Sequence, residues 1–65
     1  MPRNRLLIQI DEELVHARAS LKFWRDQATL LAETEFQVTA KRQVMHREAE
    51  IQRLLEAQEA LLKGA

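Results

Sequence analysis

The chain has 65 residues and no cysteine, and its ten basic side chains balance ten acidic ones, so the formal net charge is zero. Residues 1–33 and residues 34–65 each carry five charges of either sign, which argues against long-range attraction to nucleic acid or to an anionic membrane. The composition also excludes a disulfide framework and a thiolate site. Because so short a chain buries a small core, association between copies is the usual additional source of stability.

The longest run of large apolar residues is Leu6-Leu7-Ile8, far short of the roughly 20 residues that span a bilayer. Basic residues precede this run as they do in a signal peptide. However, the acidic residues 11–13 end the apolar segment too early for that interpretation. We therefore expect a cytoplasmic protein without a membrane partner.

Residues 5–10 fit two structures. Apolar residues alternate with others in the period of two that is typical of a β-strand, yet Leu7 and Ile10 also begin a helical repeat. Asp11 is a candidate N-cap, because Glu12 and Glu13 would then lie in the first turn beside the positive end of the helix dipole. The sequence leaves this stretch open between strand and helix, with a helix beginning directly after Asp11 at the latest.

A heptad repeat runs without interruption through the first half of the chain. Apolar residues are separated alternately by three and four positions, which is the pattern of a helix that buries one narrow face against another helix. Trp24 lies on this repeat, so we expect it in the core. The positions are Leu7, Ile10, Leu14, Ala17, Leu21, Trp24, Ala28 and Leu31.

Beyond Leu31 the apolar positions change phase, which predicts a turn at about residues 33–35. Thr34 and Gln37 have the form of a capping box, a polar cap followed three residues later by a side chain that can reach back. A second apolar stripe follows the turn. Its members are Phe36, Ala40, Val44, Ile51, Leu54, Leu55, Leu61 and Leu62.

The two stripes predict an all-α fold with a single domain over residues 1–65. We expect a first helix over about residues 6–32 and a second over about residues 36–63, packed antiparallel as a hairpin. Doubled apolar positions such as Leu54-Leu55 widen the stripes and favour assembly into a dimeric helical bundle. One alternative fold is a continuous coiled-coil helix about 75 Å long, and the other is an N-terminal strand over residues 5–10 followed by helices.

The sequence carries no catalytic motif. His16 and His46 are the only histidines, and neither has a second ligand at metal-binding spacing. Ser20 is the only serine and has no neighbouring motif that would activate it. Gly64 is the only glycine, so there is no glycine-rich phosphate loop. We expect a protein that is not an enzyme and that uses neither a metal nor another cofactor.

Arg18, Lys22 and Arg25 form a basic edge at helical spacing, and Phe23 is next to it in sequence. An aromatic residue with arginine beside it is typical of binding hot spots. We therefore predict that these four residues contact another protein. The favoured function is a non-enzymatic interaction module, acting as a regulator, adaptor or inhibitor, that forms a homodimer and presents a helical face to a protein partner.

The segment from Arg5 to Leu14 reads RLLIQIDEEL, and it resembles the start of ribbon–helix–helix repressors. In that family an N-terminal strand pairs with its twin in a dimer, and its outward side chains enter the DNA major groove. The resemblance implies that Arg5, Leu7 and Gln9 would contact DNA. It provides the alternative function, a DNA-binding transcriptional regulator, although the zero net charge makes nucleic acid the less favoured partner.

Overall fold

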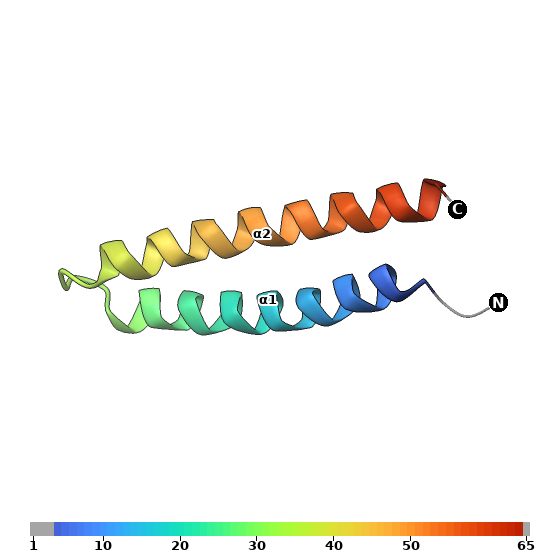
Figure 1. The fold of residues 1–65 in the computed structure, drawn as a ribbon. Helices are drawn as coiled ribbons and strands as arrows, with labels where there is room; N and C mark the ends of the chain where they lie inside the picture. The colour runs from blue at the N-terminus through green and yellow to red at the C-terminus, as the bar shows by residue number, and fades with distance from the viewer. Residues whose placement is uncertain (1–3, 65) are drawn as a thin grey trace.

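The computed structural model describes residues 4–64, and every regular element among them is an α-helix. Helix α1 spans Arg5–Leu30 and helix α2 spans Gln37–Gly64. The helices run side by side in opposite directions, with the connecting loop at one end and the start of α1 and the end of α2 at the other (Figure 1). The expected all-α helical hairpin is confirmed. The alternative of one continuous helix is wrong, because the chain reverses direction between α1 and α2.

Asn4 caps α1 and determines where the helix begins. Its side-chain Oδ1 accepts a hydrogen bond from the Leu6 N–H at 2.8 Å, and its carbonyl accepts from the N–H groups of Leu7 and Ile8 at 3.1 and 3.2 Å. These bonds satisfy the first amides of a helix that includes residues 5–10. The strand considered for these residues is therefore wrong, and the described chain, residues 4–64, contains none.

Asp11, the expected N-cap, lies within α1. Its carboxylate accepts a hydrogen bond at 2.8 Å from the side-chain amide of Gln58, which lies near the other end of the sequence on α2. The expectation was wrong because the cap forms earlier, at Asn4. Asp11 instead ties the second turn of α1 to the last turns of α2.

Residues 31–36 form the loop and contain no glycine. Glu33 supplies the reversal with a φ of 70°, a left-handed conformation that non-glycine residues rarely adopt. The predicted capping box does not form, because the Thr34 hydroxyl donates to the Leu31 carbonyl at 2.6 Å. The Gln37 side chain, its expected partner, donates at 3.4 Å to the carbonyl of Ala28 across the turn. As a result α1 ends at Leu30 and α2 begins at Gln37, so the loop is longer than the turn that we expected.

The heptad repeat of α1 faces α2, as predicted. Each of its positions from Leu7 to Leu31 is buried or half-buried. Leu14 and Ala17, at the centre of the repeat, are only 4% and 3% exposed. Trp24 is on the same face but is half-buried rather than buried, because α2 alone does not cover the indole.

Helix α2 packs on α1 through a heptad repeat that cannot be recognised from its apolar residues alone. Three positions of this repeat are polar, namely Gln37, Arg47 and Gln58, and each is half-buried. Gln37 and Gln58 reach hydrogen-bond acceptors on α1, which compensates for the loss of water around their amides. The full set of packing positions is Gln37, Ala40, Val44, Arg47, Ile51, Leu54, Gln58 and Leu61.

The predicted second stripe is therefore only partly correct. Ala40, Val44, Ile51, Leu54 and Leu61 face α1, as expected. The other three members of that stripe are exposed, and they are Phe36, Leu55 and Leu62.

Candidate interaction surface

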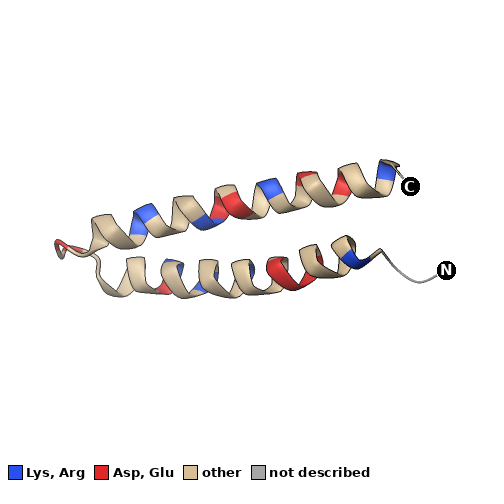
Figure 2. Ribbon diagram, in the orientation of Figure 1, with Lys and Arg blue, Asp and Glu red and all other residues tan. Residues whose placement is uncertain are grey.

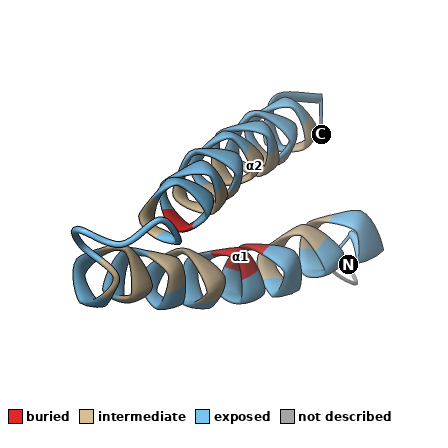
Figure 3. Ribbon diagram, turned by 90° about the vertical axis from the view of Figure 1, so that its left-hand side faces the viewer, coloured by how far each residue is buried: buried red, intermediate tan, exposed pale blue. Residues whose placement is uncertain are grey.

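Packing of one helix on the other leaves most of the apolar surface uncovered. Among residues 4–64 only Leu14, Ala17 and Ala40 are buried (Figure 3). Large apolar side chains are instead exposed along both helices and in the loop. They are Leu6, Ile8, Val15, Phe23, Leu30, Phe36, Val38, Met45, Leu55 and Leu62.

The total accessible surface shows the same shortage of burial. The chain exposes 5329 Å² at a mass of 7.6 kDa. A folded monomer of that mass is expected to expose about 4,300 Å². The excess, roughly 1,000 Å², is similar to the 800 Å² or so that each partner hides in a standard protein–protein interface.

The exposed apolar residues of α1 and α2 fall on two sides of the hairpin, which flank the packed repeats, and Phe36 lies in the loop. An ion pair between Arg25 of α1 and Glu48 of α2, with an N–O distance of 3.6 Å, marks the first side. A groove of about 480 Å³ on that side is lined by Thr29 and Met45 among others. Residues seven positions apart lie in one column along a helix that packs by heptads. The columns through Arg25, Thr29, Met45 and Glu48 contain six exposed aliphatic residues. We call this surface the aliphatic side, and its members are Ile8, Val15, Val38, Met45, Leu55 and Leu62.

Phe23 lies on the opposite side. A second groove, also about 480 Å³, opens there between Glu13 and His16 of α1 and Arg47 and Glu50 of α2. Phe23 is seven residues beyond His16 in the same column. Its ring meets that of Trp24 edge-on, with the centroids 5.1 Å apart and the planes at 76°. With Leu6 and Leu30, which the same spacing places here, Phe23 defines the aromatic side.

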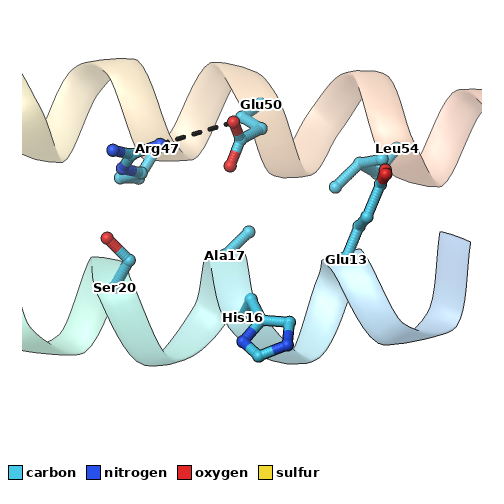
Figure 4. A pocket seen from close by; sticks show the side chains of 7 residues that line it. All are labelled: Glu13, His16, Ala17, Ser20, Arg47, Glu50 and Leu54. Carbon is cyan, nitrogen blue, oxygen red and sulfur yellow. Dashed lines mark hydrogen bonds and ion pairs between the residues drawn. The ribbon is translucent and has the colours of Figure 1, made fainter. Parts of the chain in front are cut away.

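Arg47 is the most unusual residue of this second groove. Its guanidinium lies 3.4 Å from the Glu50 carboxylate, and both residues face Ser20 and Ala17 of α1 (Figure 4). The His16 ring points away from α2 in the same view. Within the described residues, the Arg47 Nε atom is buried without a hydrogen-bond partner. The groove therefore contains charged groups that partly satisfy each other, and its lining is less apolar than that of the groove on the aliphatic side.

The structure separates the four residues predicted to contact a protein partner. Arg18, Lys22 and Arg25 are exposed on the aliphatic side, and Arg25 is paired with Glu48. Phe23 is 53% exposed but lies on the aromatic side, because adjacent residues of a helix point about a quarter of a turn apart. The four do not form one patch. Each helix carries both basic and acidic residues along its length (Figure 2).

The residues that the ribbon–helix–helix resemblance assigned to DNA do not form a DNA-reading ribbon. Arg5, Leu7 and Gln9 belong to the first turns of α1, where successive side chains do not alternate between two faces. Leu7 turns toward α2 and is half-buried, whereas Arg5 and Gln9 are exposed. The ribbon geometry required by that function is therefore absent from residues 5–10.

Among residues 4–64 no group of three or more His, Cys, Asp or Glu side chains lies close enough together to hold a metal ion. Within the same range neither helix is sufficiently long and apolar to cross a bilayer. Comparisons of the chain with protein-family models, with curated proteins and with solved structures found no match.

Proposed function

We propose that this chain is a non-enzymatic protein–protein interaction module whose hairpins associate into a dimeric helical bundle and present a helical face to another protein. The observation that carries this proposal is the uncovered apolar surface. Ten large apolar side chains are exposed on a chain that buries only three residues in its described part. Exposed apolar patches are typical of surfaces that bind another protein.

The energetics of so small a core support association. One core in a chain of this size rarely supplies more than about 3–5 kcal/mol of stability, and here even Trp24 of the packed repeat is only half-buried. Binding a second protein surface stabilises the folded state by mass action. Self-association would thus supply burial that the single hairpin lacks.

Phe23 is the residue that we propose as the anchor for a protein partner. Its ring is exposed and meets that of Trp24 edge-on, a contact that lowers the side-chain entropy lost when a partner covers it. Aromatic residues of this kind dominate the free energy of binding at many interfaces. Arg18, Lys22 and Arg25 remain proposed contacts, but their place on the other side of α1 requires a partner, or a second copy, that covers that side.

Circular dichroism and analytical ultracentrifugation at micromolar concentration test self-association. We expect a mostly helical chain that sediments as a dimer or larger bundle. A well-folded helical monomer at these concentrations would contradict the proposal, since the apolar surface would then be stable in water without a cover.

A pull-down from extract of the native cells, with and without nuclease, tests partner binding. We expect the wild-type chain to retain a protein after nuclease treatment and Phe23→Ala to lose it. Glu12→Ala, a change at another exposed position of α1, is the matched control and should retain it. Capture that disappears on nuclease treatment would point to nucleic acid instead.

A further inference from the structure

We infer that the aliphatic side is the surface on which a second copy of this chain packs. This inference rests on the proposed function, which requires self-association, and adds which of the two sides is used. Three observations favour a second copy as the partner on this side. They are the arrangement of the apolar residues, the balance of charges and the area to be covered.

The six aliphatic residues form patches at both ends of the hairpin. Because α1 and α2 run antiparallel, the first half of α1 lies beside the second half of α2 (Figure 1). Ile8 and Val15 therefore share the open end with Leu55 and Leu62, while Met45 and Val38 lie toward the loop. All six are exposed on a single hairpin.

The charged residues between and around these patches suit a second copy. A symmetric dimer uses the same surface on both subunits, so that surface must complement itself. The aliphatic side carries both signs in nearly equal number, which permits pairing between copies and avoids strong repulsion. Its basic residues are Arg18, Lys22, Arg25 and Lys41, and its acidic residues are Asp11, Glu48 and Glu59.

The groove on the aliphatic side can receive side chains from the second copy. It is lined by Ala28 and Val44 of the packed repeats and by Thr29 and Met45 beside them, with Arg25 and Lys41 also contributing. An apolar groove of about 480 Å³ between two helices resembles the holes that receive side chains in helical bundles. The Arg25–Glu48 pair is 60% and 51% exposed, so it is free to rearrange when a neighbouring helix arrives.

The area also fits a second copy. Each partner of a standard interface hides about 800 Å², close to the excess of roughly 1,000 Å² that this chain exposes over a folded monomer of its mass. The aromatic side is less suited, because its groove is lined by the charged residues Glu13, Arg47 and Glu50. Covering that groove would remove charges from water without a new partner for each.

Matched pairs of charge insertions distinguish the two sides. Val15→Glu with Met45→Glu changes two aliphatic-side residues that are 67% and 71% exposed, and Leu6→Glu with Leu30→Glu changes two aromatic-side residues that are 54% and 75% exposed. Analytical ultracentrifugation should show self-association weakened about tenfold or more by the first pair, because two charges per copy would be buried. The second pair should leave it unchanged. The opposite result would overturn the inference while the proposed self-association stands.

Thiol protection provides a test that does not require the dimer to be disrupted. The chain has no cysteine, so Met45→Cys and Leu30→Cys each introduce a single thiol. Maleimide labelling of Met45→Cys should slow about tenfold or more as the protein concentration rises through the dimerisation range, whereas Leu30→Cys should label at a constant rate. Protection of Met45→Cys only after addition of native extract would assign this side to another protein and overturn the inference. A wild-type chain that stays monomeric would contradict both this inference and the proposed function.

Discussion

Replacement of Arg47 by leucine should stabilise the hairpin. Arg47 occupies a packing position of α2 between Val44 and Ile51, where the heptad repeat would ordinarily place an apolar residue. Its Nε is buried and has no hydrogen-bond partner within residues 4–64. The Arg47→Leu substitution removes this polar atom and extends the apolar contact with Ala17 of α1, which lines the same groove.

The size of the effect follows from three contributions. A buried polar group without a partner costs about 1–3 kcal/mol. The ion pair that would be lost, between Arg47 and Glu50 side chains that are 30% and 37% exposed, contributes at most about 1 kcal/mol. A fully buried leucine contributes about 1.5–3 kcal/mol, and the half-covered site reduces that figure. We expect a net gain of about 1–2 kcal/mol, or a melting temperature higher by roughly 5–15 °C.

Urea and thermal unfolding followed by circular dichroism measure this gain. Protein concentration must be equal for all variants, because association adds to the apparent stability. Arg53→Leu is the matched control, since Arg53 is exposed on the same helix and should change the stability by less than about 0.5 kcal/mol. A loss of stability in Arg47→Leu, with no change in the control, would refute the reasoning and show that the guanidinium makes a net stabilising contact.

Two other substitutions test the core and the loop. Leu14→Ala should lower the free energy of unfolding by about 3–5 kcal/mol, which is close to the whole stability of so small a core. Leu30→Ala, on the exposed surface, should lower it little. Similar urea midpoints for the two variants would contradict the assignment of Leu14 to the core. Glu33→Gly should raise the free energy of unfolding by about 0.5–1 kcal/mol and the melting temperature by several degrees. Glycine relieves the left-handed backbone strain of about 1–2 kcal/mol, and its larger loss of backbone freedom on folding offsets part of that gain. Glu35→Gly has no positive φ to relieve and should give no gain.

The candidate surface could be predicted from the sequence only in part. The spacing of Arg18, Lys22 and Arg25 correctly indicated an exposed edge. Phe23, which the sequence predicts to contact a protein partner, is exposed. Its separation from the basic edge follows from the heptad repeat of α1, because the repeat places Phe23 and the three basic residues on opposite sides of the packed face. Which residues of α2 line each of these sides is decided by the packing of the two helices.

The packed face of α1 was determined by the sequence alone, because every position of its repeat from Leu7 to Leu31 is apolar and a helix has one way to bury such a stripe. The sequence predicted five of the eight packing positions of α2, and only the tertiary structure decided the three polar ones, Gln37, Arg47 and Gln58. Gln37 and Gln58 lie in the interface since α1 offers an acceptor opposite each, the Ala28 carbonyl and the Asp11 carboxylate. A polar side chain is tolerated in a helix interface only where such a partner lies across from it, and the identity of that partner depends on the register of two helices that are distant in sequence.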